Sequence, residues 1–470
     1  MPKGASCGAS ASCSRIDGSG WLVGLLPGCC GVCASCGREA RRAGVGGAPG
    51  SWRHGRRRLR WLAALAALVL GVVSCGGQEF EAGPLGAVEV TRGEAIQIRS
   101  MQVLTELGEL GIPNQRGVAM AVADYGPIGG HDVSMGEGLD SLCTEEGGQA
   151  AADAVIGAPR VVGVIGTSCS VAAAAASPLL SKAGLVMISP SNTAPSLTSD
   201  LDGNAGSNYH PGYYRTANND LHQARVVAEF AYNELGLRRT AAIHDGDPYT
   251  SGLTGAFSIA FEELGGSTIV APISRGDVNM VPALTQIAAD SPDSLFFPLF
   301  QEEGAHILRQ VGQVAGLEDV TLLGGAALLV SEFLAIPESE GVYFPGPDLD
   351  FDGNTNEATG KTSETLFADY RDRYGQAPTS AYVPHAYDAA TILLHAIEQV
   401  AVAGDGDTLY IDRAKLREAL TGLTGFRGII GAISCDEFGD CGVGSVQIAH
   451  HTDSNTTDIA DLPIVYRFTP

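Results

Sequence analysis

The chain has 470 residues and a formal net charge of −24, and its length predicts two or three domains. The acidic balance argues against nucleic acid as a partner, because phosphate binding needs a basic surface. The charge is unevenly distributed: residues 1–74 carry ten Lys or Arg and two Asp or Glu, so the acidity belongs to the remainder.

A basic run at residues 53–60 precedes thirteen apolar residues at 61–73. This apolar run is too short to span a bilayer comfortably as a helix, but it fits the hydrophobic region of a signal peptide. The small residues before Cys75 resemble a bacterial lipobox. We therefore expect residues 1–74 to be a leader with a lipoprotein signal peptide, and Cys75 to anchor the mature protein to the membrane on the extracytoplasmic, periplasmic side. An ordinary cleaved signal peptide or a short anchor is the alternative.

Strand and helix patterns alternate after an expected linker at residues 75–93, which predicts an α/β fold with parallel βαβ units and right-handed crossovers. The first expected elements are strand 95–103, a glycine-bearing turn at 107–111, helix 115–125, a weak strand from 133 and helix 148–156. From residue 213 the expected elements are a crossing segment at 213–216, a helix that follows residues 218–220 and continues to 235, strand 240–244, helix 251–264, strand 268–273, helix 280–289, strand 294–300, helix 303–315 and strand 320–323. The last expected elements are a crossing at 341–344, helices 363–374 and 385–400, a crossing at 426–428 and an antiparallel ribbon within 429–468.

Two neighbouring strands, at residues 161–165 and 185–188, end in turns rich in hydroxyl groups. Ser170 is a candidate N-cap for the alanine-rich segment that follows the first turn. Pro178 is expected to end that segment or to start a second one with Ser177 as its cap. In open α/β sheets, ligands bind beyond the carboxyl ends of the strands. Helix N-termini in this position suit a carboxylate or another anion. The alternative is that these Ser and Thr residues only cap helices.

The segment GTSCSVAAAAASPLLSKAGLVMISPSNTAPSLT resembles the branched-chain amino-acid (Leu/Ile/Val-type) substrate-binding proteins of ABC transporters. The resemblance runs from about residue 95 to the C-terminus through further segments in the same order, among them IHDGDPYTSG, FFPLFQEEGAHILRQVG and SAYVPHAYDAATILLHAIEQV. It implies the type I periplasmic-binding fold, in which two doubly wound parallel-sheet lobes are joined by a three-segment hinge. Lobe 1 would comprise residues 94–217 and 346–427, and lobe 2 residues 218–345 and 428–470. Closure of the hinge would enclose a small-molecule ligand.

The resemblance also implies a binding site whose polar end belongs to lobe 1. Ser168 and Ser170 would hold the ligand carboxylate, and Thr193 would contact both carboxylate and ammonium groups. Ser191 and Asn192 lie where the family offers backbone contacts.

The remaining contacts would come from an aromatic residue of lobe 2 and from an apolar lining. Tyr249 matches a family tyrosine that closes over the ligand. Leu110, together with Phe300 or Gln301, falls near positions where the family often has aromatic residues. Hydroxyl and N–H groups would therefore hold one charged end, and apolar surface would hold the tail.

One departure from the family pattern affects the ligand. Amino-acid binders of this family have a carboxylate after the next strand that pairs with the ammonium group, but residues 324–328 read GGAAL. A buried ammonium without a partner is costly. Either Asp247, Glu302 or Glu303 substitutes, or the ligand is not a simple α-amino acid, since the family also includes binders of amides, urea and aromatic acids. We expect a small polar organic ligand.

Four cysteines remain after residue 75, and an even number in an exported protein suggests disulfides. The family resemblance implies a bridge between Cys143 and Cys169. Cys435 and Cys441 are close in sequence and could close a small loop. Four free buried thiols are the alternative.

An acidic segment at residues 348–359 has the start of an EF-hand-type calcium loop, with Thr359 in place of the final Glu. Calcium is a weak candidate, a solvated acidic loop is the alternative, and no other cofactor is expected. The candidate ligands are Asp348, Asp350, Asp352, Asn354 and Asn356.

Motifs typical of metalloprotease, nucleotide-binding and serine-hydrolase sites are absent from the sequence, which predicts that the protein is not an enzyme. The sequence instead predicts a solute-binding lipoprotein that delivers its ligand to the permease and ATPase subunits of an ABC importer. A ligand-sensing subunit that signals through a membrane partner is the alternative, because this fold serves both roles.

Overall fold

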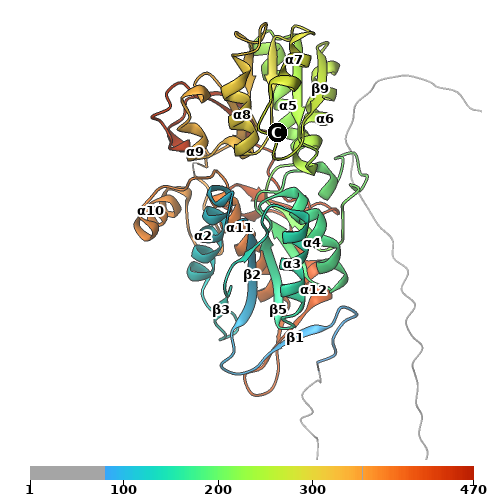
Figure 1. The fold of residues 1–470 in the computed structure, drawn as a ribbon. Coiled ribbons are helices and arrows are strands. Elements are labelled where there is room, and N and C mark those ends of the chain that lie inside the picture. Colours follow the sequence, from blue (N-terminus) through green and yellow to red (C-terminus); the bar gives the residue numbers. More distant parts are fainter. Residues whose placement is uncertain (1–79, 352, 470) are drawn as a thin grey trace, which may run out of the picture. The chain divides into compact units, whose positions relative to one another are not determined.

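The computed structural model describes residues 80–351 and 353–469 (Figure 1). The expected leader at 1–74, the expected lipidation site Cys75 and the calcium candidate Asp352 lie outside these residues. Within the described part of the chain, no helix combines the length and the apolar character needed to cross a bilayer.

The first large sheet consists of parallel strands in the order β3-β2-β5-β6-β7, and β4 pairs with the end of β2. All six residues of β5 are buried, as expected for a continuous apolar run in a parallel sheet. The strands are β2 (Ile96–Gln102), β3 (Val133–Ser134), β4 (Leu139–Asp140), β5 (Val161–Gly166), β6 (Val186–Ser189) and β7 (Tyr213–Arg215).

Helices cover both faces of this sheet, as the division of the β5 side chains between two separate cores shows. Val162 and Ile165 pack with residues of α2 (Gly108–Tyr125), α11 (Val383–Val400) and α12 (Arg413–Thr421). Val161 and Val164 pack with α3 (Glu145–Ile156) and α4 (Ser170–Lys182) on the other face. The described part of the chain also contains α10 (Ser363–Tyr374), which begins and ends where the sequence predicts.

The second large sheet has the order β18-β17-β12-β11-β10-β8-β9, parallel from β9 to β12 and antiparallel from β12 to β18. Its strands are β8 (Arg239–His244), β9 (Ser267–Pro272), β10 (Ser294–Phe296), β11 (Thr321–Leu323), β12 (Tyr343–Pro347), β17 (Val446–His450) and β18 (Ile464–Phe468). The helices along this part of the chain are α5 (Asp220–Glu229), α6 (Pro248–Glu263), α7 (Val281–Ala288), α8 (Gln301–Val311) and α9 (Ser331–Leu334).

A small sheet occupies part of the expected linker at 75–93. Strand β1 (Ala87–Val90) pairs with β14 (Leu409–Asp412), which also pairs with β13 (Ala401–Ala403). Val88 and Val90 are buried and Glu89 is exposed, so the alternation of this short segment is that of a strand with one covered face.

Several element boundaries differ from the expected ones. Helix α4 begins at Ser170 with Cys169 as its N-cap, so Ser170 is not the cap, and the helix continues through Pro178. The expected glycine-bearing turn at 107–111 is mostly the first turn of α2, where Gly111 packs so closely on β2 that a Cβ would lie within 2 Å of the Val103 carbonyl oxygen. Within the expected ribbon at 429–468, only β17 and β18 pair with each other.

The segment after β7 and the segment after β15 (Phe426–Arg427) and β16 (Ala432–Ile433) run side by side between the two sheets. The Arg215 amide donates to the Gly439 carbonyl at 3.0 Å, and the Cys441 amide donates to the Arg215 carbonyl at 3.0 Å. These bonds join the first expected crossing, at 213–216, to residues 439–441, which lie after the third expected crossing at 426–428. The residue limits of the lobes stay a prediction.

Candidate ligand-binding site

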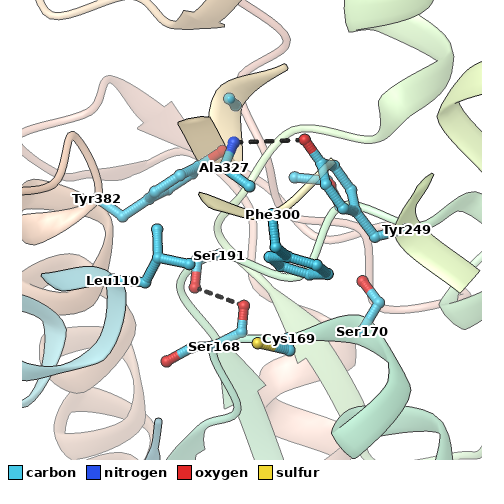
Figure 2. Close-up of a pocket in the computed structure, with 11 residues that line it drawn as sticks. Leu110, Ser168, Cys169, Ser170, Ser191, Tyr249, Phe300, Ala327 and Tyr382 are labelled. Atoms are coloured by element: carbon cyan, nitrogen blue, oxygen red, sulfur yellow. Dashed lines mark hydrogen bonds between the residues drawn. The ribbon is translucent and has the colours of Figure 1, made fainter. Parts of the chain in front are cut away.

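A cavity lies between the two large sheets and takes its lining from elements of both (Figure 2). One side of the cavity is lined by the loops after β5 and β6, by helix α2 and by the residue before α11. The other side is lined by α6 and by the segments after β10 and β11. Seven of the nine residues expected from the sequence line it. The lining residues are Leu110, Ser168, Cys169, Ser170, Ser191, Thr193, Tyr249, Phe300, Ala326, Ala327 and Tyr382.

Ser170 is the first residue of the thirteen-residue helix α4, whose N-terminal end meets the cavity. Its hydroxyl oxygen accepts one hydrogen bond, from the Ala194 amide at 3.4 Å, and the described residues offer its hydroxyl hydrogen no acceptor. Unpaired N–H groups and the positive end of a helix favour an anion. This corner of the cavity can therefore hold a carboxylate.

Thr193 and Ser191 follow β6 on the same edge of the sheet. The Thr193 hydroxyl donates to Asp220 Oδ2 at 2.8 Å, so it can only accept a hydrogen bond from a ligand. The Ser191 hydroxyl donates to the Ser168 carbonyl oxygen at 3.3 Å (Figure 2) and accepts from Asn114 Nδ2 at 3.1 Å. Thr193 is thus suited to an N–H donor such as an ammonium group.

The side chains of Ser168, Asn192 and Gln301 are directed elsewhere. The Ser168 hydroxyl donates to Gln102 Oε1 at 2.8 Å and accepts from the Val103 amide at 3.1 Å. Asn192 is fully buried outside the cavity lining. Gln301 donates to the Ala327 carbonyl oxygen at 3.0 Å and lines an outer pocket. The expected ligand contacts of these three residues therefore stay a prediction.

Tyr249 is placed by the first turn of α6. Asp247 caps this helix by accepting the Tyr249 amide at 2.8 Å, and the Tyr249 hydroxyl accepts the Ala327 amide at 3.3 Å (Figure 2). A Cβ on Gly325 would lie 2.7 Å from the Tyr249 hydroxyl oxygen, so glycine leaves room for the phenol. The ring lies 5.6 Å from that of Phe300. Together these two aromatic residues form the wall contributed by the second sheet.

Tyr382 lines the cavity and was not expected from the sequence. It lies directly before α11 and is 6% exposed. Burial raises the pKa of its phenol, and the nearby Asp220 carboxylate raises it further. The signal that would have found it is an aromatic residue at the start of the segment SAYVPHAYDAATILLHAIEQV, which resembles the family.

The three acids considered from the sequence do not line the cavity. Asp247 caps α6, and burial raises its pKa to about 6. Glu303 accepts the Gly276 amide at 2.8 Å, and Glu302 lines the outer pocket with it. Asp220 does not line the cavity either, but it is bonded to Thr193, which does, through both its carboxylate and its amide.

Comparison with known proteins identifies the family. The family model described as periplasmic binding protein matches residues 105–444. The chain belongs to this family. It is 28% identical over 299 residues to the Leu/Ile/Val-binding protein homolog 3 of Brucella melitensis, an alignment that covers 62% of this chain and 73% of the relative. It is 27% identical over 342 residues to the leucine-, isoleucine-, valine-, threonine- and alanine-binding protein of Pseudomonas aeruginosa, which covers 71% and 83% of the two chains.

The fold agrees with a solved structure of the same type. A leucine-binding protein from Thermotoga maritima superposes with a TM-score of 0.68 at 24% identity, over 80% of this chain and 99% of that one. The expected type I periplasmic-binding fold and the resemblance to branched-chain amino-acid binding proteins are therefore confirmed.

Both cysteine pairs considered from the sequence lie at bonding distance in this member of the family. Cys143 and Cys169 have Cα atoms 5.2 Å apart, and Cys435 and Cys441 have Cα atoms 4.0 Å apart. The first pair joins the turn after β4 to the N-cap of α4, which lines the cavity.

Replacing Cys143 and Cys169 together with serine will lower the free energy of unfolding by about 3.5 kcal/mol, because a loop of 26 residues then gains freedom in the unfolded chain. Urea unfolding followed by circular dichroism measures this loss. The matched control replaces Cys435 and Cys441, which close a loop of 6 residues and should cost about 2 kcal/mol. An equal or smaller loss for the first pair contradicts the prediction.

The calcium prediction is not supported, because the described candidate ligands have partners within the protein. Asp348 and Asp350 both pair with Arg467, and Asn354 donates to the Ile429 carbonyl oxygen at 3.1 Å. Asn356 is fully buried and donates to Asp388 at 2.8 Å. Among the residues the structure describes, no group of three or more His, Cys, Asp or Glu is arranged to hold a metal ion.

Proposed function

We propose that this periplasmic binding protein captures a small organic carboxylate in the cavity between its two sheets. The observation that carries the proposal is Ser170 at the N-terminal end of α4, facing a cavity that Tyr249 and Phe300 close from the other sheet. The family assignment supports ligand capture without chemical conversion. We further propose that the bound solute is delivered to the permease and ATPase subunits of an ABC importer.

The apolar half of the cavity suggests a ligand with an apolar tail. Leu110, Phe300, Ala326 and Ala327 line it together with the aromatic part of Tyr382. Two relatives carry names that specify binding of leucine, isoleucine and valine. We therefore propose an amino acid, an amide or a related carboxylate as the ligand class. The names of these two relatives describe solute binding, which supports the transport role that we carry forward.

Mass spectrometry of ligand that co-purifies with the protein, followed by a thermal-shift screen of amino acids, amides and carboxylates, tests the proposal. We expect at least one compound with a carboxylate or amide end to raise the melting temperature, and to be recovered unchanged after incubation. A screen in which no such compound stabilises the protein contradicts ligand capture. Recovery of a converted compound contradicts binding without catalysis.

We also propose that the protein lies outside the cytoplasm and is held to the membrane by a lipid on Cys75. The two disulfide pairs support an oxidising compartment. A Cys75→Ser variant should move from the membrane fraction to the soluble extracytoplasmic fraction and should lack the lipid mass at its N-terminus. Cys36→Ser, which changes a cysteine within the expected leader, is the matched control. It should leave both the membrane location and the lipid mass unchanged. Retention of the Cys75→Ser variant in the membrane contradicts the anchor.

A further inference from the structure

A second cavity, of about 490 Å³, lies among the segments that connect the two large sheets. Its lining comes mainly from the segment between β12 and α10, the segment between β15 and β17, and the first turn of α11. It shares no lining residue with the candidate ligand-binding site. We call it the hinge cavity, and its lining includes Asp348, Asp350, Phe351, His385, Ala432 and Ser445.

Hydrogen bonds tie the hinge cavity to all three connecting segments. The Ser445 carbonyl oxygen accepts from Asn218 Nδ2 at 2.6 Å and from the Asp348 amide at 3.4 Å. The Thr216 hydroxyl donates to the His385 carbonyl oxygen at 2.9 Å. Thr216 and Asn218 follow β7, so the shape of the cavity depends on how the three segments are arranged. These are the segments that must bend when two hinged lobes open or close.

His385 lies between the hinge cavity and the candidate ligand-binding site. It is 1% exposed, and its Nδ1 has no hydrogen-bond partner among the residues the structure describes. Its ring centroid lies 6.5 Å from that of Phe351, which lines the hinge cavity, and 5.5 Å from that of Tyr382, which lines the ligand-binding site (Figure 2). Burial lowers the pKa of the imidazole to about 3, so the ring is neutral. A buried nitrogen without a partner beside a cavity points to an occupant that completes it.

The charge of the lining favours a cation as that occupant. Asp348 and Asp350 share a single guanidinium, that of Arg467, which lies 3.8 Å from Asp348 and donates to Asp350. Two carboxylates against one guanidinium leave a net negative charge, and the described lining contains no Lys or Arg. Phe351 and Val443 add apolar surface. A cavity of several hundred Å³ with apolar walls and a few charged groups suits a small organic molecule.

We propose that the hinge cavity binds a small organic amine with an apolar part, and that its occupation strengthens ligand capture at the candidate ligand-binding site. The carboxylates of Asp348 and Asp350 would accept the ammonium group, and Phe351 would contact the apolar part. A donor of the amine, or a water enclosed with it, would complete the His385 ring. This site goes beyond the proposed function, and only the coupling rests on that function.

The sign of the coupling follows from contacts across the ligand-binding site. Arg275 Nη1, after β9, donates to the Cys143 carbonyl oxygen in the turn after β4 at 2.8 Å. The Glu332 amide of α9 donates to Glu109 Oε2 of α2 at 2.8 Å. The two sides of the site are therefore already joined in this arrangement. An occupant that fits the hinge cavity in the same arrangement stabilises it, so less free energy is needed to enclose a ligand.

Isothermal titration calorimetry on the purified full chain tests the site with two matched pairs, 2-phenylethylamine with 2-phenylethanol and 3-methylbutylamine with 3-methylbutanol. Each pair differs only in the charged group. We expect the amine to bind roughly 10- to 100-fold more tightly than its alcohol, the effect of hydrogen bonds to charged groups. An Asp348→Asn, Asp350→Asn double variant should lose this preference. The matched control, Glu357→Gln with Asp369→Asn, removes two acids paired outside the cavity lining and should keep it.

A second variant blocks the hinge cavity without changing its charge. Ala432 is an exposed residue of the lining, and Ala432→Trp should abolish amine binding by filling the cavity. Ala403→Trp, at an exposed position of β13 outside the lining, is the control and should bind the amine normally. Should the Asp348→Asn, Asp350→Asn variant fail to fold, Ala432→Trp decides, since retained binding in it places the amine elsewhere and overturns the site.

The coupling is measured with the ligand found by the thermal-shift screen. Saturating 2-phenylethylamine should lower the Kd of that ligand by about fivefold or more, and Ala432→Trp should remove the effect. An unchanged or raised Kd overturns the coupling. Absence of amine binding, equal binding of amine and alcohol, or a preference that survives in the Asp348→Asn, Asp350→Asn variant overturns the site itself. A screen that finds no ligand contradicts the proposed function instead, and the amine titrations still decide the hinge cavity.

Discussion

A Ser170→Ala, Thr193→Ala double variant will bind its ligand at least about 100-fold more weakly than the wild type while keeping its fold. Ser170 contributes a hydroxyl donor at the end of α4 and Thr193 an acceptor after β6, and hydrogen bonds to charged groups contribute about 1.5–3 kcal/mol each. Titration calorimetry with the ligand found by the thermal-shift screen measures the loss. Circular dichroism and the melting temperature show whether the fold remains.

Ser177→Ala is the matched control for this variant. Ser177 lies on the same helix, is 2% exposed and has a hydroxyl with no hydrogen-bond partner among the described residues. Removing that hydroxyl should leave both affinity and stability near the wild-type values. Normal binding by the double variant, with the control also normal, means that the ligand does not use this corner of the cavity.

The location of the site was predictable because it follows from strand periodicity. The continuous apolar runs before the two hydroxyl-rich turns are β5 and β6, which pair in parallel with Ile165 opposite Ile188. Parallel neighbours end at the same edge of a sheet, so the two turns had to meet. The family resemblance then supplied Tyr249 and Phe300, which periodicity alone does not connect with this edge.

Side-chain direction was not predictable, since it depends on partners far away in the sequence. Ser168 and Ser170 are two residues apart in the sequence. The Ser168 hydroxyl donates to Gln102 on β2, whereas the Ser170 hydroxyl only accepts a hydrogen bond, from the Ala194 amide. Tyr382 reaches the cavity from the residue directly before α11. Strand and helix periodicity does not indicate this placement, because it arises only when the distant segments pack.

The predicted limits of some helices and strands were wrong for the same reason, because they too depend on segments far away in the sequence. Pro178 lies inside α4, where intrinsic preference opposes a helix, yet Ala176 and Leu180 on either side are buried in the core between α3, α4 and the first sheet. Burial of that apolar face outweighs the lost backbone hydrogen bond. In the expected linker, β1 forms because β14, more than three hundred residues later, offers it an edge.

The network behind the cavity depends on one buried ion pair. Arg215 at the end of β7 is fully buried, and Asp440 in the segment after β16 accepts from it and from Asn219, the N-cap of α5. A Cβ on Gly439 would lie 2.1 Å from the Tyr213 carbonyl oxygen, so the two segments approach as closely as glycine permits. The charge of Arg215 lowers the pKa of Asp440 despite its burial. This stabilisation is therefore present above the unfolded pKa of about 4 and is lost as the pH falls through the lower folded value.

Asp440→Asn will lower the free energy of unfolding by about 3 kcal/mol or more at neutral pH, because it leaves the Arg215 charge buried without a counter-charge. Glu357→Gln, which breaks the exposed pair with Arg427, is the control and should cost less than about 1 kcal/mol. Urea unfolding at pH 7 measures both, and a loss in Asp440→Asn no larger than in the control contradicts the prediction. Asp440 also holds Asn219, the N-cap of α5, whose first residue Asp220 accepts the Thr193 hydroxyl. The same variant should therefore weaken binding of the ligand found by the thermal-shift screen, whereas the control should not. The ion pair thus couples the stability of these segments to the position of Thr193 in the cavity.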